Sequence, residues 1–261
     1  MTPTPPLPPA GRELLAGKIV LVTAAAGTGI GNATARRCLE EGATVVLSDA
    51  HERRLGEAAD ELAGLGGALP LTLVCDVTSE EQVQAMVAGT VAEHGRVDVV
   101  VNNAGLGGTA ELVDMTDEQW HKVLDITLTG TMRCLRATLR QMYAQESGGV
   151  VVNNASVLGW RAQAGQAHYA AAKAGVMALT RSAAVEAAPH GVRINAVAPS
   201  LAMHAFLAKV TTDELLDELT QREAFGRAAE PWEIATVIAF LASDYSTYMT
   251  GEVVSVSSQH P

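Results

Sequence analysis

The sequence predicts an α/β fold: a doubly wound parallel sheet of about seven strands, with helices on both faces, in a single domain. Short runs that are apolar throughout alternate with segments of helical periodicity. Strands that are apolar throughout are typical of parallel sheets buried on both faces. Right-handed crossovers then wind such a sheet in both directions. The 261 residues suffice for one domain with a sizeable core.

Each element follows from a local pattern. The predicted strands are KIVLVT (18–23), ATVVLSD (43–49), LTLVCDV (71–77), VDVVVNNAG with its turn (97–105), GVVVNNAS (149–156), VRINAVAP (192–199) and GEVVSVSS (251–258). The predicted helices are 31–42, 51–66, 79–95, one long helix over roughly 117–145, the helix containing HYAAAKAG, a helical region over roughly 200–225, and 231–243. Ser79 is suited to cap the third helix, and Pro231 to begin the last.

Composition excludes several classes of function. The net charge of -11 and the absence of a Lys/Arg run argue against a nucleic-acid partner. No apolar run reaches the roughly 18 residues of a membrane span. The start, MTPTPPLPPAG, has no signal-peptide pattern, and its prolines predict an extended, mobile arm over residues 1–15. We expect the domain itself to occupy residues 16–261.

The three cysteines, Cys38, Cys75 and Cys134, are scattered and show no CxxC spacing. We therefore expect neither a metal site nor disulfides, and interpret the cysteines as small buried apolar residues. Free thiols fit a reducing cytoplasm.

A glycine-rich turn follows the first strand. In VTAAAGTGIGNATA, every second residue from Gly27 to Gly31 is glycine, and this turn lies between a predicted strand and a predicted helix. Such glycines let the backbone approach a pyrophosphate, which then lies on the helix N-terminus. Asp49 ends the second strand, and a carboxylate there would accept hydrogen bonds from ribose hydroxyls and repel a 2′-phosphate. The turn thus predicts NAD as cofactor rather than NADP; the alternative is that Asp49 only caps the next helix.

The segment HYAAAKAG places Tyr169 and Lys173 about one helical turn apart, on one face. A nearby cation lowers the pKa of a phenol from about 10, so this pair could exchange a proton with an alcohol or carbonyl. Ser156 ends a predicted strand, where ligands bind in such sheets, and its hydroxyl could bond a substrate oxygen. The alternatives are an ordinary helix-surface pair and a plain turn serine.

Together these segments resemble the short-chain dehydrogenase/reductase family, with its Rossmann-type fold, over roughly residues 16 to 258. The resemblance rests on AAAGTGIG, SD after the second strand, CDV (75–77), NNAG (102–105), NNAS (153–156), YAAAK (169–173) and INAVAP (194–199). All occur in the order of the family and nearly at its spacing.

The resemblance implies a role for each matching residue. Tyr169 would be the general acid/base, Lys173 its tuning cation and a ligand of the nicotinamide ribose, and Ser156 the hydrogen-bond donor to the substrate oxygen. The implied cofactor contacts are Gly27, Thr28, Gly29, Ile30, Gly31, Asp49, Asp76, Val77, Asn103, Ala104, Gly105, Tyr169, Lys173 and Pro199. The resemblance also implies a homotetramer, with helices 117–145 and 167–188 packing across one interface.

The chain departs from the family pattern at four places. Ala24 follows Thr23 where the family has glycine, and the turn carries one extra residue. Thr127 stands where the family has an asparagine that holds a water of the proton relay; we include it among the catalytic candidates, with an ordinary helix threonine as the alternative. Ser200 stands where the family has a glycine, and His204 lies near the position of a family threonine. The tail VVSVSSQHP lacks the usual glycines.

The substrate is predicted from the region after Pro199 and from a closer resemblance. That region is amphipathic, and an apolar lid suits a bulky alicyclic or acyl substrate, although the same face could pack on the domain itself. TAAAGTGIG, NNASVLGWRAQ and YMTGEVVSVSSQ resemble an actinobacterial subgroup linked to degradation of the steroid C/D rings. We expect an NAD-dependent oxidoreductase acting on a secondary alcohol or ketone, on a hydroxylated bicyclic coenzyme A ester. The alternatives are a 3-oxoacyl thioester reductase and a non-catalytic dinucleotide-binding subunit.

Overall fold

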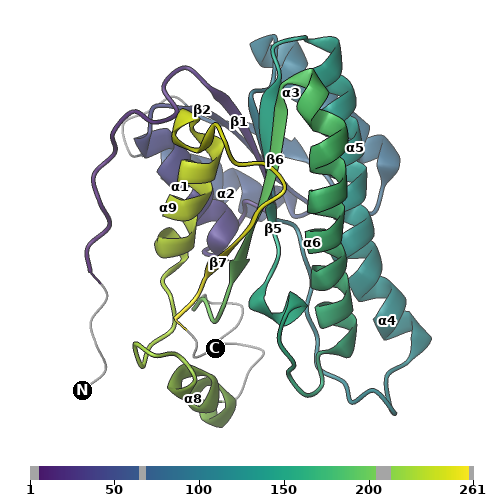
Figure 1. The fold of residues 1–261 in the computed structure, drawn as a ribbon. Helices are drawn as coiled ribbons and strands as arrows, with labels where there is room; N and C mark the ends of the chain where they lie inside the picture. Colours follow the sequence, from purple (N-terminus) through teal and green to yellow (C-terminus); the bar gives the residue numbers. More distant parts are fainter. Residues whose placement is uncertain (1–5, 65–68, 204–212, 259–261) are drawn as a thin grey trace.

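The computed structural model describes residues 6–64, 69–203 and 213–258. Within these ranges, seven parallel strands form one sheet in the order β3-β2-β1-β4-β5-β6-β7 (Figure 1). The strands are β1 (Ile19–Thr23), β2 (Thr44–Asp49), β3 (Leu71–Val74), β4 (Val99–Asn102), β5 (Gly149–Asn154), β6 (Val192–Pro199) and β7 (Val253–Val256). The predicted fold class is confirmed. The order reverses between β1 and β4, which is the switch point where such sheets bind ligands.

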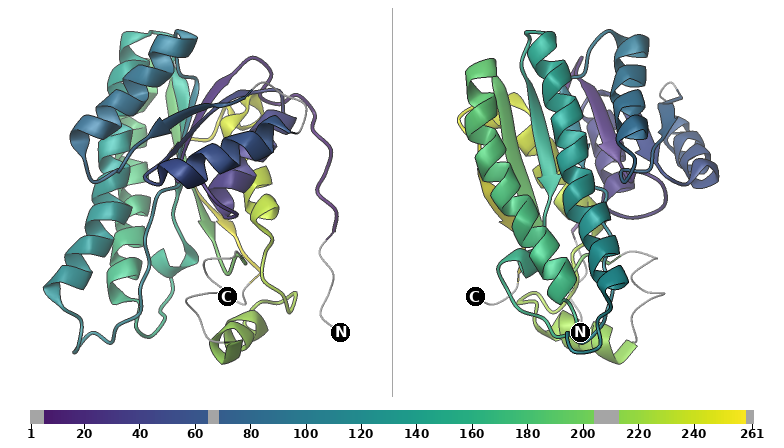
Figure 2. Two further views of the ribbon diagram at one scale, coloured as in Figure 1. Left: turned by 180° about the vertical axis from the view of Figure 1, so that it is seen from behind. Right: turned by 90° about the vertical axis from the view of Figure 1, so that its right-hand side faces the viewer.

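Helices cover both faces of the sheet (Figures 1 and 2). One layer holds α1 (Ile30–Glu40), α2 (Glu52–Ala63) and α9 (Pro231–Ala242), and the other holds α3 (Glu80–His94), α5 (Gly130–Ala144) and α6 (Ala167–Ala187). Two further helices, α4 (Asp117–Leu124) and α8 (Asp213–Gln221), lie at the end of the sheet drawn at the bottom of Figure 1.

The alternation of side chains along the strands supplies a hydrophobic core on each face of the sheet. Val20 and Val22 of β1 pack in the core beneath α1 and α9, whereas Leu21 packs in the core beneath α3 and α5. All three are fully buried. Because successive side chains of a strand point to opposite faces, an apolar run supplies both cores at once.

The long helix predicted over 117–145 has the expected extent but not the expected continuity. A π-helical segment, Asp125–Thr129, separates α4 from α5. Thr127 lies inside it and is fully buried. A π-helical turn leaves the helical periodicity within each flanking helix intact. The apolar pattern therefore predicted one uninterrupted helix.

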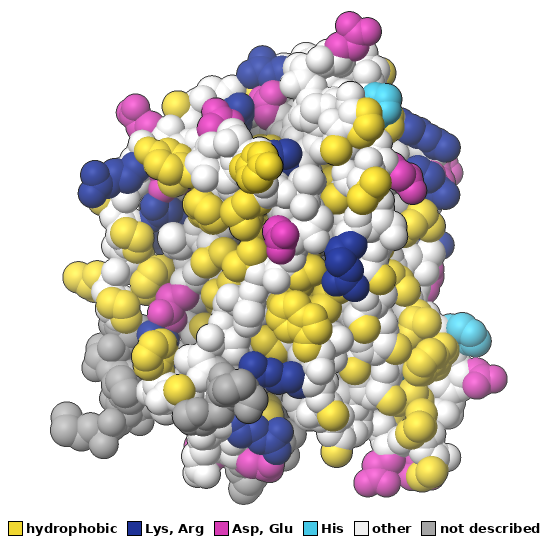
Figure 3. Space-filling model, in the orientation of Figure 1, with side chains coloured by type: hydrophobic (Ala, Val, Ile, Leu, Met, Phe, Trp, Pro, Cys, Tyr) yellow, Lys and Arg dark blue, Asp and Glu magenta, His cyan; other side chains and the backbone are white. Residues whose placement is uncertain are grey.

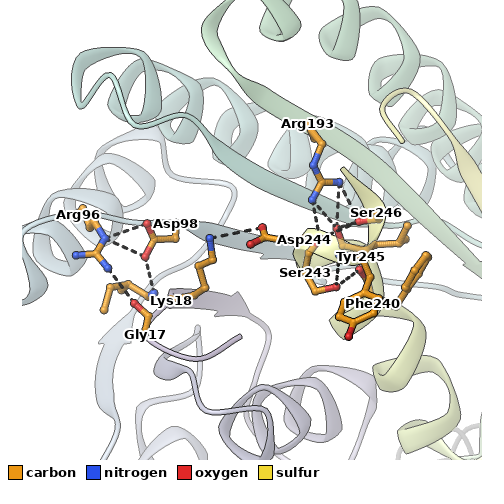
Figure 4. A network of polar contacts seen from close by, with 12 residues as sticks. Gly17, Lys18, Arg96, Asp98, Arg193, Phe240, Ser243, Asp244, Tyr245 and Ser246 are labelled. Atoms are coloured by element: carbon orange, nitrogen blue, oxygen red, sulfur yellow. Dashed lines mark hydrogen bonds and ion pairs between the residues drawn. The ribbon is translucent and has the colours of Figure 1, made fainter. Parts of the chain in front are cut away.

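Polar contacts close the amino ends of the strands (Figure 4). The guanidinium of Arg96 donates to both carboxylate oxygens of Asp98, at 2.9 and 3.0 Å, and Asp98 accepts from the backbone N–H of Ile19 at 2.8 Å. Arg193, near the start of β6, donates to the carbonyl of Ser243 and the hydroxyl of Ser246. These bonds lie at the end of the sheet opposite to the loops that carry the predicted site residues.

The segment before β1 is tied to α1 by a buried ion pair. Arg37, on α1, pairs with Glu41, which is fully buried. Glu41 also accepts backbone hydrogen bonds from Arg12 and Leu14, at 2.7 and 3.1 Å. Burial disfavours the charge of Glu41, but these bonds and Arg37 outweigh it and lower its pKa. The proline-rich composition did not predict this anchoring of residues 9–15.

The three cysteines are buried, as predicted, and each carries a free thiol. Burial raises the pKa of Cys38 to about 12 and that of Cys75 to about 11, and it also raises the pKa of Cys134. No helix in the described part of the chain is long and apolar enough to cross a membrane. Among the same residues, no three His, Cys, Asp or Glu side chains gather as a metal ion would require.

Candidate active site

The predicted site residues follow the carboxyl ends of several strands. The turn 24–29 follows β1, Asn103 to Gly105 follow β4, Ser156 follows β5, and Pro199 ends β6. These strands are neighbours in the sheet. Because parallel strands end at the same edge, their loops share one edge of the molecule.

The glycine-rich turn approaches the β4 loop more closely than a side chain would allow. A Cβ atom at Gly31 would lie 2.2 Å from the carbonyl oxygen of Ala24 and 2.5 Å from Nδ2 of Asn103. Gly27 has a φ of 89°, in the left-handed region that favours glycine. Ala24 also has a positive φ, 49°, which alanine adopts with strain.

The first turn of α1 is open to an anion. Gly29 is the N-cap residue, no side chain caps the helix, and the first turn contains no acidic residue. Thr28 is exposed, while Ile30 is half-buried. The backbone N–H groups at a helix N-terminus need acceptors, and the helix dipole favours negative charge there.

Asp49 supports the glycine-rich turn. Its carboxylate accepts hydrogen bonds from the backbone N–H groups of Ala26, at 3.2 Å, and His51, at 3.0 Å. Burial raises the pKa of this carboxyl above its ordinary value. The next helix, α2, has His51 as N-cap residue and no side-chain cap, so Asp49 is not its cap.

Asp76 and Val77 follow β3, next to the end of β2. The Asp76 carboxylate is exposed and accepts from the backbone N–H and hydroxyl of Thr78, at 2.9 and 2.8 Å. Val77 is buried, and its Cγ2 would lie 2.7 Å from a Cβ at Gly130, the first residue of α5. Val77 therefore packs on the helix that begins after the π-helical segment.

A chain of amides joins β5, β4 and β1. Nδ2 of Asn103 donates to the carbonyl of Ala24 at 3.1 Å, and Nδ2 of Asn154 donates to Oδ1 of Asn103 at 2.8 Å. The backbone N–H groups of Asn103 and Ala104 both donate to Oγ1 of Thr23, at 2.9 and 3.2 Å. The loop after β4 is thereby held against the glycine-rich turn.

Ser156 and Tyr169 bring two hydroxyl groups together. The Ser156 hydroxyl lies near the Tyr169 phenol, and its oxygen accepts a hydrogen bond from the backbone N–H of Leu158 at 3.2 Å. Burial raises the pKa of Tyr169 to about 12, although part of the residue reaches solvent, and the nearby Ser156 hydroxyl opposes this rise. The predicted lowering of the phenol pKa is therefore not found in this structure, because burial of the phenol outweighs the groups around it.

Lys173 is buried beside Tyr169, one turn along α6. Its Nζ donates to the main-chain carbonyl of Asn154 at 2.6 Å and lies 5.5 Å from the centroid of the Tyr169 ring. Only 3% of the residue is exposed, and burial lowers the pKa of its ammonium to about 8. A Cβ at Gly105 would lie 3.3 Å from Nζ, so the β4 loop passes directly over the ammonium.

Thr127 clamps the β4 loop. Its hydroxyl accepts from the backbone N–H of Leu106 at 2.9 Å and donates to the carbonyl of the same residue at 3.1 Å. The single hydroxyl proton is thus already committed to Leu106. A Cβ at Gly105 would lie between Oγ1 of Thr127, at 3.7 Å, and Nζ of Lys173. Thr127 orients the loop beside the lysine and makes no direct hydrogen bond to Lys173 or Tyr169.

Pro199 pairs with Val256 of β7, and the N–H of Ser200 donates to the carbonyl of Val256 at 3.2 Å. The end of β6 is thereby fixed to the last strand. His204 lies outside the described residues, as does part of the predicted lid.

Comparison with known proteins identifies the family. A family model described as Enoyl-(Acyl carrier protein) reductase matches residues 24–258. A Mycobacterium tuberculosis protein named (5R,7aS)-5-hydroxy-7a-methyl-1-oxo-2,3,5,6,7,7a-hexahydro-1H-indene-carboxyl-CoA reductase is 66% identical over 252 residues, 97% of this chain and 96% of its own. The crystal structure of a short chain dehydrogenase from Mycobacterium smegmatis has a TM-score of 0.88 and 62% identity, over 98% of both chains. The chain belongs to the short-chain dehydrogenase/reductase family.

A more distant relative of this short-chain dehydrogenase/reductase is a 3-oxoacyl-[acyl-carrier-protein] reductase of Thermotoga maritima. It is 39% identical over 246 residues, 93% of this chain and 97% of its own. The protein is accordingly an oxidoreductase, and its family and fold imply a nicotinamide dinucleotide cofactor. The alternative of a non-catalytic binding subunit is not supported, since these relatives are named as enzymes.

The residues of this site fit a dinucleotide. The absence of a side chain at Gly31 lets the first turn of α1 pack directly against Ala24 and Asn103, and the uncapped N-terminus of α1 offers backbone N–H groups to the oxygens of a diphosphate. Asp49 would hold the adenosine ribose, and Lys173 the nicotinamide ribose. When bound, the dinucleotide supplies the hydride acceptor or donor.

Two residues of the site were missed in the sequence. His168 is buried next to Tyr169; its Nδ1 accepts from the Tyr169 N–H at 2.9 Å, and burial lowers its pKa. Its Nε2 would lie 3.3 Å from a Cβ at Gly108, in the loop that extends past Gly105. Asn154 is the other, and its only signal was the doubled asparagine in NNAS.

Proposed function

We propose that this enzyme interconverts a secondary ring alcohol and a ketone on a hydroxylated bicyclic coenzyme A ester derived from a steroid, with NAD as cofactor. The main support is the 66% identity to a reductase named for a hydroxylated, methylated indene-carboxyl-CoA. The neighbouring hydroxyls of Ser156 and Tyr169, beside buried Lys173, supply suitable chemistry for an oxygen-bearing carbon.

In this proposal, Ser156 and Tyr169 hold the substrate oxygen between their hydroxyl groups. During oxidation, the O–H bond of the alcohol breaks and its proton passes to the phenolate oxygen of Tyr169. During reduction, the phenol returns that proton to the carbonyl oxygen. Since the free site, with Lys173 in place, holds the phenol pKa at about 12, the positive charge of an oxidised nicotinamide ring would be needed to favour the phenolate. Thr127 acts indirectly, by holding the loop that passes over the lysine.

The preference for NAD rests on Asp49. Its carboxylate lies at the end of β2, bound to the backbone of the glycine-rich turn. A carboxylate there accepts hydrogen bonds from both hydroxyls of an adenosine ribose and repels a 2′-phosphate. We infer that Asp76, on the adjacent loop, borders the adenine.

Apolar and basic groups near the predicted lid suit a coenzyme A ester. Trp160 and Phe225 are 50% and 64% exposed, in the segments that follow β5 and α8. Lys and Arg side chains lie at the lower end of the molecule, around α8 (Figure 3). Arg222, just after α8, is half-exposed and pairs with Glu218. Apolar walls favour the ring system, and cations favour the phosphates of coenzyme A.

A 3-oxoacyl thioester reductase is the second candidate, favoured by the 39% identity to the Thermotoga maritima enzyme. Both candidates use the same proton chemistry and differ in the acyl group. The deciding experiment follows NADH formation by absorbance, with NAD and either a hydroxylated bicyclic coenzyme A ester or a linear 3-hydroxyacyl coenzyme A. Turnover of the bicyclic ester alone supports the proposal. Turnover of the linear ester alone supports the second candidate.

We also infer a homotetrameric assembly in the cytoplasm. Support for assembly comes from α5 and α6, which lie side by side on one flank of the molecule (Figure 1), and from Val185 of α6, which is 76% exposed. Support for the location comes from the three unpaired cysteines. Light scattering on the purified enzyme tests the assembly; a mass of one or two chains would contradict it.

A further inference from the structure

The amide chain at the carboxyl edge of the sheet has a fixed direction. The carbonyl of Ala24 can only accept, so Asn103 must present Nδ2 to it and Oδ1 to Asn154. Asn154 must then donate with its own Nδ2. Its Oδ1 is consequently turned away from Asn103. The network as a whole therefore fixes the orientation of both amide groups.

Oδ1 of Asn154 has no partner among the described residues, although it is buried. Buried acceptors without a partner are uncommon in native proteins, and each one calls for a group that satisfies it. Asn154 is the last residue of β5, and its main-chain carbonyl holds the ammonium of Lys173. The unpartnered oxygen therefore belongs to the residue that connects the lysine to the glycine-rich turn.

The face on which Asn154 lies is known from its neighbour. Asn153 donates to the hydroxyl of Thr180 on α6, at 2.9 Å. Since successive side chains of a strand alternate, Asn154 lies on the opposite face, with Asn103 and Gly31. A Cβ at Gly31 would lie 2.5 Å from Nδ2 of Asn103, so this amide chain packs directly against the glycine-rich turn, whose helix N-terminus is uncapped.

We propose that Asn154 positions the dinucleotide: its Oδ1 accepts a hydrogen bond from a hydroxyl or amide donor of the nicotinamide half, while its Nδ2 keeps Asn103 in place. The proposal rests on the proposed function, because it assumes the dinucleotide site described above. The side chain of Asn154 would then connect the nicotinamide half of the cofactor, near Lys173, to the glycine-rich turn at the diphosphate. A structural water on Oδ1 is the competing explanation.

The test compares two adjacent asparagines. Asn154→Ala removes the free acceptor, whereas Asn153→Ala removes a paired amide on the other face of the same strand. Affinities for NADH and for ADP are measured by titration calorimetry, after thermal unfolding has shown that each variant is folded. NADH carries both halves of the dinucleotide, and ADP carries only the adenine half.

We expect Asn154→Ala to weaken NADH binding about three- to tenfold, in line with the loss of one neutral hydrogen bond, and to change ADP binding less than about twofold. Asn153→Ala should lower the unfolding temperature and leave both affinities unchanged.

Unchanged NADH affinity in Asn154→Ala would overturn the proposal and favour a structural water. Equal losses of NADH and ADP would also overturn it, because they would indicate collapse of the whole turn. Should Asn154→Ala not fold, Asn154→Leu takes its place in the same titrations, with the same two outcomes. Failure of the unmodified enzyme to bind NADH would refute the proposed function itself, so the two failures are distinguishable.

Discussion

The ammonium of Lys173 donates a 2.6 Å hydrogen bond to the main-chain carbonyl of Asn154. This bond joins α6 to the end of β5 and fixes the lysine below the loop that contains Gly105. The ammonium is otherwise buried, and the cost of removing it from water lowers its pKa from 10.5 to about 8. Burial of the Lys173 ammonium therefore lowers the free energy of unfolding of the protein.

Replacing this lysine should stabilise the protein without cofactor. The lowered pKa corresponds to about 3 kcal/mol against the charged form at pH 7, because one pKa unit is worth about 1.4 kcal/mol. After loss of the bond to Asn154, we expect Lys173→Met to raise the free energy of unfolding by about 1–2 kcal/mol at pH 7. Chemical denaturation measures this change, and turnover should be abolished.

The effect of Lys173→Met should depend on pH in one direction. Between pH 8 and 10.5, the unfolded chain holds a proton on Lys173 and the folded chain does not, so the unmodified enzyme gains stability as pH rises. The advantage of the methionine variant should be full below pH 8 and should shrink between pH 8 and 10.5. A variant that is less stable than the unmodified enzyme at pH 7 would contradict this account.

Gly31→Ala should disrupt the glycine-rich turn. The new Cβ would lie 2.2 Å from the carbonyl oxygen of Ala24, which is backbone and cannot move aside freely. We expect a loss of about 1–3 kcal/mol in the free energy of unfolding and at least a roughly tenfold loss of NADH affinity. Gly56→Ala, in α2 with open space around the position, is the control and should stabilise by about 0.5–1 kcal/mol. Equal changes in stability and NADH affinity for Gly31→Ala and Gly56→Ala would show that the close contacts of Gly31 are not required.

Thr127→Val should loosen the loop after β4. Valine keeps the shape of threonine but leaves the N–H and carbonyl of Leu106 without their partner. The expected loss is about 1–3 kcal/mol in the free energy of unfolding, with faster hydrogen exchange at Leu106. Thr127→Ser keeps the hydroxyl and should restore slow exchange at Leu106. If Thr127→Ser and Thr127→Val show equally fast exchange at Leu106, the hydrogen bonds of the hydroxyl do not hold this loop.

Ala24→Gly should stabilise the turn slightly. Alanine at a φ of 49° carries about 1–2 kcal/mol of strain, and glycine removes this strain while adding about 0.5–1 kcal/mol of freedom to the unfolded chain. The net expectation is a gain of up to about 1 kcal/mol, seen as a higher unfolding temperature. A clear loss of stability would mean that the alanine methyl group makes contacts that outweigh its strain.

Much of this architecture could be predicted from local sequence. The apolar runs predicted all seven strands, and β6 matches its predicted range from Val192 to Pro199. Ser79 caps α3 as expected, accepting from the N–H of Gln82. Such features depend on residues that are close together in the chain, and an apolar strand buried on both faces has few alternatives.

Features that depend on contacts between distant residues were not predicted. Within the π-helical segment, Thr127 bonds to Leu106, twenty-one residues away in the chain. Arg37 and Glu41 are one helical turn apart, but Glu41 also binds the backbone of Arg12 and Arg37 that of Pro9, and these partners are far from α1 in the chain. Likewise, the spacing of Tyr169 and Lys173 indicated proximity, but the degree of burial decides the direction of the phenol pKa.

We propose that Tyr169 exchanges the proton of the substrate oxygen. Tyr169→Phe tests this role most directly, with turnover of the bicyclic coenzyme A ester and NADH affinity measured on the same folded sample. We expect turnover to fall about 10²–10⁴-fold, with NADH affinity changed by less than about threefold. Turnover that persists within about tenfold of the unmodified enzyme would show that another group exchanges the proton, and would contradict the account.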